Sequence, residues 1–327
     1  MFTPQYIQLY MSGELAKRVN LLKARLHRCD ICPRECKVNR FASNSGFCRS
    51  GYLASVSSYC DHHGEEPVLS GRRGSGTIFF QNCNLKCVYC QNYQISQETD
   101  INFNEMGPEA LARVMLHLQN DLHCHNINLV SPSHFVPQIV EAIYYAVPLG
   151  LKIPLVYNTN AYDALATLKL LRGIIDIYLP DIKYASDIWA IKFSQAKSYV
   201  AISRAAIIEM YDQVGDLVVD PSGIALRGLI VRHLILPHDI AGSEDSLTWL
   251  AENVSRNVTV SIMSQYHPCH LAFQQPLLAR HITPEEYKEV IGIVDRLGLE
   301  NGWLQSMDSA QDYLPDFNRE GHPFSIS

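Results

Sequence analysis

The sequence predicts an α/β fold, a partial parallel (β/α)6 barrel of the TIM type preceded by a small N-terminal cysteine-rich metal module. From about residue 77, short and continuous apolar runs alternate with longer amphipathic stretches, as expected for parallel strands that are buried on both faces. Six such units follow in series, and a chain of 327 residues with 47% hydrophobic content can bury a core of that size. Four closely spaced cysteines ahead of the first strand predict the module.

The six predicted strands are separated by predicted helices. The strands are TIFFQN (77–82), NINLVS (126–131), PLVYNTN (154–160), DIYLPDIKY (176–184), GLIVRHLILP (228–237) and TVSIMSQYHP (259–268). The helices cover 108–122, 135–147, 162–174, 187–213 and 243–254. The segment 187–213 is longer than its neighbours and has Ser203 near its middle, so it is interpreted as one long helix or two.

Three regions follow from this order. An N-terminal helix and the cysteine-rich module occupy residues 1–70, the barrel occupies 71–270, and a C-terminal helix with an extended tail occupies 271–327. The tail after Gly302 is polar and contains two prolines, which predicts an extended or partly disordered end. Ligands of such barrels bind at the carboxyl ends of the strands, so the loops after the strands are the expected site.

A cysteine loop follows the first predicted strand directly. Cys83, Cys87 and Cys90 stand in QNCNLKCVYCQN with the spacing C-x3-C-x2-C. A four-iron, four-sulfur (4Fe–4S) cluster normally takes four thiolates, so three cysteines leave one iron open to bind a small molecule. Zinc is the rival metal, but it needs a fourth ligand and Cys124 is distant in the sequence. A merely buried trio is disfavoured because the loop is polar.

This loop resembles that of the radical S-adenosylmethionine (SAM) superfamily, and the run GSGTIFFQNCNLKCVYCQNYQIS is similar to the branch of pyruvate formate-lyase (glycyl-radical enzyme) activating enzymes. The resemblance implies that the open iron chelates the methionine moiety of SAM. It also implies that one electron cleaves the sulfonium to give a 5′-deoxyadenosyl radical, which abstracts hydrogen. Tyr89, the aromatic residue before the third cysteine, would lie against the adenine.

A second set of cysteines lies upstream, in CDICPRECKVNRFASNSGFC. Cys29, Cys32, Cys36 and Cys48 have the spacing C-x2-C-x3-C-x11-C, which suits a closed four-thiolate site. Zinc and a second iron–sulfur cluster both fit this ligand set. The metal could have the purely structural role of stabilising a small module. Alternatively, it could be an auxiliary cluster that relays electrons or anchors substrate.

Polar residues at successive strand ends are the candidate cofactor contacts. Ser131 follows the second strand, where the family usually has a Gly-Gly-Glu stretch that this chain lacks. Asn158 follows the third strand and suits hydrogen bonds to ribose or carboxylate. Asp181 and Lys183 resemble the Asp-x-Lys element of glycyl-radical activating enzymes, and their alternation places both on one side of the strand.

Arg232 lies inside an apolar strand and must find an anionic partner, because an unpaired buried charge is costly. The expected partners are the cofactor carboxylate and Asp181. His233 points to the opposite side and is expected to pack or cap. His267 and Cys269 follow the sixth strand, and each is interpreted either as a substrate contact or as an ordinary core residue.

Upstream of the first strand, an acidic segment is expected either to border the mouth of the site or to be a solvated loop; it contains His63, Glu65, Glu66 and Pro67.

Composition limits the functional classes. A net charge of −6 gives no overall electrostatic attraction to nucleic acid or anionic membranes. No transmembrane run or secretory signal is recognised, and ten cysteines without such a signal favour metal sites in the reducing cytoplasm.

The expected partners are an electron donor such as flavodoxin or ferredoxin and, by resemblance, a partner protein that donates hydrogen from a backbone glycine. The N-terminal cysteine module counts against pyruvate formate-lyase itself as that partner. The alternatives are radical modification of a small molecule, peptide or RNA, and a non-catalytic iron–sulfur electron carrier or sensor.

Overall fold

A curved, mostly parallel sheet forms the centre of the protein. The computed structural model describes residues 2–98, 104–307, 315–317, 319 and 323–324. The strands are β1 (Ala54–His62), β2 (Ser75–Phe80), β3 (Glu105–Met106), β4 (Ile127–Val130), β5 (Leu155–Thr159), β6 (Ile177–Pro180), β7 (Val218–Val219), β8 (Ala225–Leu234), β9 (Thr259–Met263) and β10 (Gly302–Leu304).

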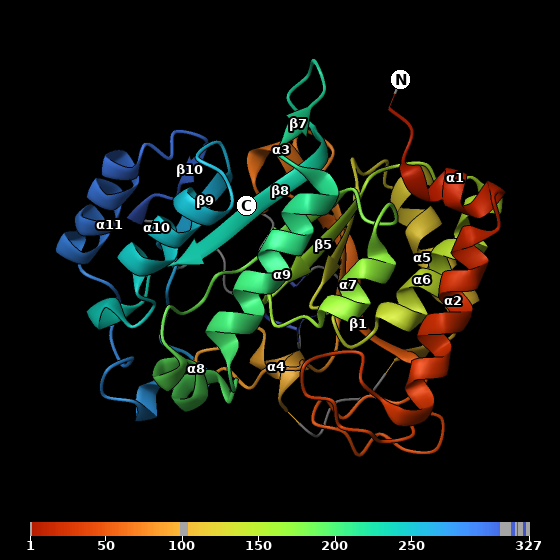
Figure 1. Ribbon diagram of the computed structural model, residues 1–327, viewed down its shortest axis with the longest axis horizontal. Coiled ribbons are helices and arrows are strands. Elements are labelled where there is room, and N and C mark those ends of the chain that lie inside the picture. Colours follow the sequence, from red (N-terminus) through yellow and green to blue (C-terminus); the bar gives the residue numbers. More distant parts are fainter. Residues whose placement is uncertain (1, 99–103, 308–314, 318, 320–322, 325–327) are drawn as a thin grey trace.

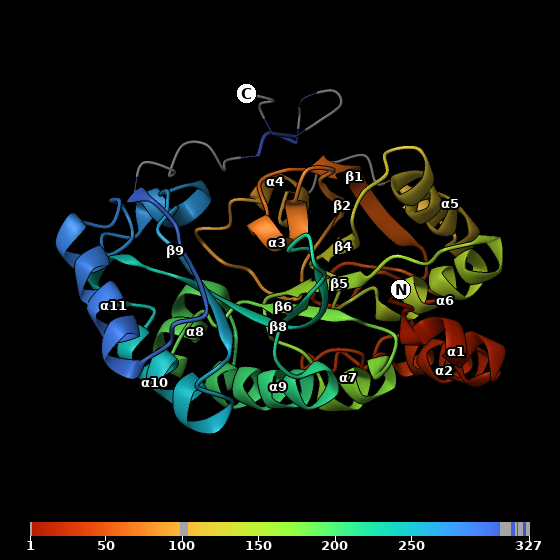
Figure 2. The same ribbon diagram turned by 90° about the horizontal axis from the view of Figure 1, so that it is seen from above.

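The helices cover most of the outer face of this sheet. They are α1 (Gln5–Met11), α2 (Glu14–Ala24), α3 (Pro67–Ser70), α4 (Tyr93–Ser96), α5 (Pro108–Asn120), α6 (Val136–Ala146), α7 (Leu165–Leu171), α8 (Asp187–Ser194), α9 (Tyr199–Val214), α10 (Ser243–Asn253) and α11 (Pro284–Leu297). Single 3-10 turns lie at Arg25–Arg28, Val147–Leu149, Pro237–Asp239 and His270–Gln274. Figure 2 shows α5, α6, α7, α9, α10 and α11 around the convex side of the sheet.

The strand order is that of an incomplete barrel. It runs β10-β9-β8-β6-β5-β4-β2-β1-β3, and β7 pairs with β8. All neighbours from β2 to β10 along this path are parallel, whereas β1 pairs antiparallel with both β2 and β3. The central strands are buried throughout, including all residues of β2, β4, β5 and β6. The fold is therefore a partial parallel barrel, as the sequence predicts (Figure 1).

The predicted strands correspond to β2, β4, β5, β6, β8 and β9. The segment 187–213 forms two helices, α8 and α9, because Gln195 and Ser198 adopt left-handed backbone conformations between them. From Gly302 the chain is extended and forms β10, a seventh parallel strand that the sequence did not predict. Most of the remaining predicted tail lies outside the described residues.

The strand β1 was not predicted. It contains ASVSSYCDH, and its serines hide the strand pattern, but Ala54 and Val56 are fully buried. Its place next to β2 covers the edge of the parallel sheet, which would otherwise expose unpaired backbone groups.

The two N-terminal helices lie against the outside of the barrel beside α6 and α7 (Figure 2). The Tyr6 hydroxyl donates to the Ile153 carbonyl at 2.9 Å, and Arg25 donates to the Thr167 hydroxyl at 2.9 Å. The C-terminal helix of the prediction is α11, which begins with a capping box between Thr283 and Glu286. In the part of the chain that the structure describes, no helix has the length and apolar character needed to span a membrane.

Candidate functional site

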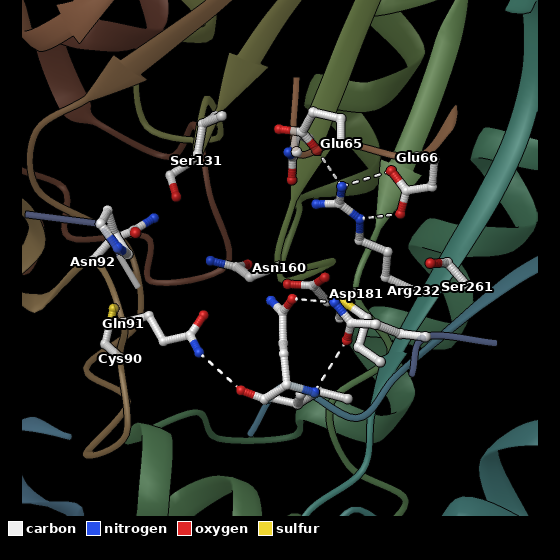
Figure 3. Close-up of a pocket in the computed structure, with 18 of the residues that line it drawn as sticks. Glu65, Glu66, Cys90, Gln91, Asn92, Ser131, Asn160, Asp181, Arg232 and Ser261 are labelled. Atoms are coloured by element: carbon white, nitrogen blue, oxygen red, sulfur yellow. Dashed lines mark hydrogen bonds and ion pairs between the residues drawn. The ribbon is translucent and has the colours of Figure 1, made fainter. Parts of the chain in front are cut away.

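A cavity of about 530 Å³ opens at the carboxyl ends of the parallel strands. This volume is in the range of small-molecule and cofactor sites. Its walls come from the cysteine loop after β2, from the ends of β4, β5, β6, β8, β9 and β10, and from the acidic segment before α3. The position is the one that parallel barrels use for ligands. Figure 3 shows the polar side chains that point into it.

The three cysteines of the loop all line this cavity, and each sulfur has a hydrogen-bond partner. Asn160 Nδ2 lies 3.5 Å from Cys83 Sγ, Ser194 Oγ donates to Cys87 Sγ at 3.0 Å, and Cys90 Sγ lies 3.4 Å from a serine hydroxyl. The loop is held in place from α8, because the amides of its residues 86 and 88 donate to the carbonyls of residues 194 and 193. Hydrogen bonds to the sulfurs are the contacts by which proteins tune the potential of a bound cluster.

The three thiols of the loop are a fitting donor set for a cluster. In a 4Fe–4S cluster each thiolate binds its own iron, so three cysteines around one cavity wall can hold three of the irons. Burial raises the pKa of the Cys87 thiol to about 11, and the pKa values of Cys83 and Cys90 are raised by the same cause.

All six residues expected to contact the cofactor line the same cavity as the cysteines; they are Tyr89, Ser131, Asn158, Asp181, Lys183 and Arg232. They come from four different strand ends and from the cysteine loop itself. Tyr89 is buried, and its hydroxyl donates to the Tyr184 hydroxyl at 2.8 Å. Tyr184 in turn lies 2.7 Å from the Ser194 hydroxyl, so a chain of hydroxyl groups leads from Tyr89 to Cys87.

Asp181 and Lys183 form an ion pair of 2.7 Å inside the cavity wall. Both point to the same side of the chain, as their alternation predicts. Burial alone would lower the pKa of Lys183, but the charges of Asp181 and Cys87 outweigh it and the pKa is raised. Lys183 therefore stays protonated close to the cysteine loop.

Residues 77–213 match the family model of the radical SAM superfamily. The matched residues lie within the barrel, which is therefore similar to members of this superfamily. This match implies an enzyme that cleaves SAM through radical chemistry, with a 4Fe–4S cluster and SAM as cofactors. The cysteine loop lies within the matched residues, and this loop with the cavity beside it is called the radical SAM site below.

Two curated relatives come from the archaeon Methanocaldococcus jannaschii. The uncharacterized protein MJ0674 is 29% identical over 294 residues, which are 86% of this chain and 79% of that protein. The uncharacterized protein MJ0808 is 26% identical over 180 residues, which are 50% of this chain and 51% of that protein.

Two solved structures are similar at a lower level. HydG, described as a maturase of the FeFe hydrogenase, has 11% identity and a TM-score of 0.46 over 68% of this chain and 49% of its own. A structure of TYW1 with a lysine–pyruvate adduct bound has 10% identity and a TM-score of 0.43 over 72% of this chain and 78% of its own. Both TM-scores are below 0.5, and the similarity to the radical SAM superfamily rests on the sequence match.

Arg232 has ion-pair partners that the sequence did not suggest. The side chain lines the cavity, and its ion pairs in the described structure are with Glu65 and Glu66, whereas Asp181 pairs with Lys183. Arg232 Nε donates to Glu66 at 2.7 Å, and Nη2 donates to both Glu65 and Glu66 (Figure 3). Burial alone would raise the pKa of Glu66, but its pairing with Arg232 holds that pKa below the usual value.

Glu65 places a carboxylate beside β4, the strand after which this chain lacks the Gly-Gly-Glu stretch. It accepts a hydrogen bond of 2.9 Å from the Nδ2 atom of Asn128, which lies on β4, the strand that carries that stretch in other members. Two carboxylates against one guanidinium leave a net negative charge in the cavity wall beside β4. The acidic segment therefore borders the radical SAM site as predicted for Glu65, Glu66 and Pro67, whereas His63 is exposed and does not line the cavity.

Three non-glycine residues with left-handed backbone conformations follow strands at this site. Asn82 (φ 67°) comes after β2, Ser131 (φ 57°) after β4 and Ala161 (φ 61°) after β5. Such conformations are uncommon for residues with a side chain and cluster at functional sites. They turn the backbone sharply at the strand ends, where the cavity begins.

The remaining candidates lie beside the site. His233 is fully buried and bonded to the Ile182 carbonyl and the Ser243 hydroxyl, so it packs as predicted. His267 does not line the cavity and lies against His281. Cys269 is also absent from the cavity wall, although its Sγ donates to the Tyr89 carbonyl at 3.5 Å.

The four N-terminal cysteines line a second, smaller cavity together with Arg34, Arg40 and His134; they are Cys29, Cys32, Cys36 and Cys48. The sequence thus correctly groups these four residues in space.

Sequence reasoning did not find the residues that support the thiols of the barrel loop from elsewhere in the chain. Ser194 is an example, because a lone serine in a predicted helix carries no signal of such a role.

Proposed function

We propose that the protein cleaves SAM reductively at a 4Fe–4S cluster bound by Cys83, Cys87 and Cys90, and that the hydrogen atom it removes comes from a backbone glycine of a partner protein. The observation that carries the proposal is the meeting of the three cysteines with the six expected contact residues around one cavity. These residues are spread over some 150 positions of the sequence, so their convergence is a property of the fold.

The bound cluster supplies one electron and a free iron position. The chain's own residues would hold the rest of SAM. The negative wall formed by Glu65 and Glu66 suits the methionine ammonium, and the Ser131 and Asn158 side chains suit the ribose or carboxylate oxygens. Lys183, protonated beside Cys87, would stabilise the negative charge of the thiolates and of the SAM carboxylate.

Two features support a protein as the hydrogen donor. The first is the Asp-x-Lys element at Asp181 and Lys183, which resembles that of glycyl-radical activating enzymes. The second is α8, which supports the cysteine loop and exposes Ile188 (72%) and Ile191 (49%). Exposed aliphatic side chains next to a catalytic loop suit contact with a macromolecule.

The radical chemistry is tested with anaerobically reconstituted and reduced protein. We expect SAM to shift the electron paramagnetic resonance signal of the cluster and 5′-deoxyadenosine to form. The Lys183→Met variant should retain its iron but form 5′-deoxyadenosine about 10- to 100-fold more slowly, because SAM is then held less well. The exposed His63→Ala variant is the matched control and should behave as the wild type. An intact cluster that neither responds to SAM nor yields 5′-deoxyadenosine would contradict the proposal.

The hydrogen donor is tested with isotopes. Cells are grown on α-deuterated glycine, and their extract is separated into proteins and small molecules before reaction with the reduced enzyme and unlabelled SAM. Deuterium in 5′-deoxyadenosine from the protein fraction would support a backbone glycine. Deoxyadenosine that forms only with the small-molecule fraction would reject the protein donor and favour a metabolite as substrate.

A further inference from the structure

The second cavity, formed by the N-terminal cysteines, contains more positive charge than its surroundings balance. Arg40 is 2% exposed and lines the cavity. Its guanidinium donates only to the carbonyls of Gly51 and His134, at 2.5 to 3.1 Å. No carboxylate pairs with it in the part of the chain that the structure describes. A buried cation without a counter-charge is costly, so an anion is expected nearby.

Arg34, which is half-buried, lines the same cavity and also donates to backbone carbonyls. Its Nε donates to the Asn84 carbonyl at 2.9 Å and its Nη1 to the Gln195 carbonyl at 2.5 Å. Its Nη2 is buried and has no hydrogen-bond partner among the described residues. The one acidic residue of the cavity wall, Glu35, is largely exposed and pairs with Lys37.

His134 provides an independent sign of a missing ligand. The residue is 1% exposed and lines the cavity. Its Nε2 lies 2.9 Å from the Gln81 carbonyl, whereas its Nδ1 has no partner in the described structure. Buried polar atoms in native proteins nearly always have a partner.

We propose that Cys29, Cys32, Cys36 and Cys48 bind a second iron–sulfur cluster, and that Arg34 and Arg40 neutralise its charge. A 4Fe–4S core with four thiolates carries a net charge of about −2, which two guanidinium groups balance. The backbone already donates to one of these thiols, from Phe47 N to Cys36 Sγ at 3.3 Å.

The spacing selects iron–sulfur over zinc. Structural zinc sites typically use two pairs of ligands, each of the C-x2–4-C type, joined by a longer connection. Here three cysteines lie within eight residues, and the fourth follows alone after eleven more. Three clustered cysteines with one remote cysteine is a ferredoxin arrangement.

The two thiol sets are neighbours in space. Arg34 of the module donates to the carbonyl of Asn84 in the cysteine loop of the barrel. The Phe47 ring lies between the two sets, with the Arg34 guanidinium 3.6 Å and the Lys86 ammonium 5.9 Å from its centre. A cluster in the module would therefore lie next to the radical SAM cluster and could pass electrons to it.

The proposal does not depend on the proposed function, and its first test removes the radical SAM cluster altogether. Iron, sulfide and zinc are measured in the full chain isolated anaerobically. The wild type should contain about eight irons per chain, and the Cys83→Ala/Cys87→Ala/Cys90→Ala variant about four. The control Cys60→Ala, outside both sets, should keep about eight. An iron-free triple variant, with or without zinc, would overturn the proposal.

The role of Arg40 is tested by the reduction potential of the remaining cluster in the triple-variant background. Removing a positive charge disfavours the more negative reduced state, so Arg40→Met should make the potential more negative. Arg40→Lys keeps the charge and should shift the potential less. Equal potentials in all three proteins would show that Arg40 does not neutralise the cluster.

Discussion

At the scale of single residues, the cavity of the barrel holds its charged groups in pairs. Arg232 is bound by Glu65 and Glu66, and Lys183 is bound by Asp181. Among the described residues of the wall, each of these charges therefore has an oppositely charged neighbour, which offsets part of the cost of burying it.

Asp176, just before β6, is a buried acidic residue outside these ion pairs. It is 5% exposed, and its carboxylate accepts one hydrogen bond, of 3.0 Å, from the Leu155 amide. Burial raises its pKa from 3.8 to about 8, although the Leu155 amide and Arg227 oppose the shift. The folded protein thus keeps a proton that the unfolded chain has lost between about pH 4 and pH 8.

We therefore expect the free energy of unfolding to fall as the pH rises through this window. The Asp176→Asn variant carries no such charge, so it should be more stable than the wild type at pH 8 by about 2 to 5 kcal/mol. It should show little difference at pH 4. Denaturant unfolding at several pH values measures the effect, and the exposed Asp295→Asn variant is the control. An unchanged pH dependence in Asp176→Asn would show that Asp176 is ionised in the folded state.

At the scale of secondary-structure elements, the edge strand β10 completes the cavity. Its residues Trp303 and Leu304 line the wall. The strand begins at Gly302, whose φ of 139° is rarely adopted by other residues. A Cβ atom at this position would overlap the Val260 carbonyl on β9.

The Gly302→Ala variant should separate β10 from β9. We expect a loss of stability of about 1 to 3 kcal/mol, weaker SAM binding, and a red shift of the Trp303 fluorescence as its ring becomes more exposed. Gly292→Ala is the matched control, because Gly292 lies in α11 with open space around it. It should stabilise the protein by about 0.5 to 1 kcal/mol. Equal stabilities of the two variants would contradict this account of Gly302.

At the scale of the whole molecule, the N-terminal helices join the cysteine module to the barrel. Lys23 on α2 pairs at 2.7 Å with Glu141 on α6, and the Tyr52 hydroxyl donates to the same carboxylate at 3.5 Å. Glu141 is 7% exposed. The charge pair therefore crosses the junction between the two regions.

Lys23→Met should leave the Glu141 carboxylate buried without its cation. We expect a loss of about 1 to 3 kcal/mol in the free energy of unfolding, and the double variant Lys23→Met/Glu141→Leu should recover most of it. The control is Lys17→Met, which removes a surface pair of 3.7 Å with Glu14 and should cost less than about 0.5 kcal/mol. A single variant as stable as the control would show that the junction does not depend on this pair.

Much of this protein could be predicted from local patterns in the sequence. Cys83, Cys87 and Cys90 lie within eight residues, so the sequence alone predicts them as the ligands of a cluster. The apolar runs of β2, β4, β5, β6, β8 and β9 are likewise local signals, because a strand buried on both faces needs apolar residues throughout. Parallel order then brings the strand ends together, which places Asp181 and Asn158 beside the cysteines.

Other features depend on contacts between distant parts of the chain. Arg232 binds a glutamate 167 residues away, and Ser194 donates to a cysteine 107 residues away. From the sequence, the expected partners of Arg232 were Asp181 and the cofactor carboxylate. The order of residues along the chain does not show which acidic side chain lies nearest to Arg232 in the folded protein. The neighbouring positions of the two thiol sets were also hidden, because 35 residues separate Cys48 from Cys83 and only the folded chain closes that gap. The sequence determined which groups can bind metal and cofactor, because that chemistry follows from residue type and local spacing. Only the tertiary structure decided how their charges are paired and supported, because the pairing of charges depends on distances that the fold creates.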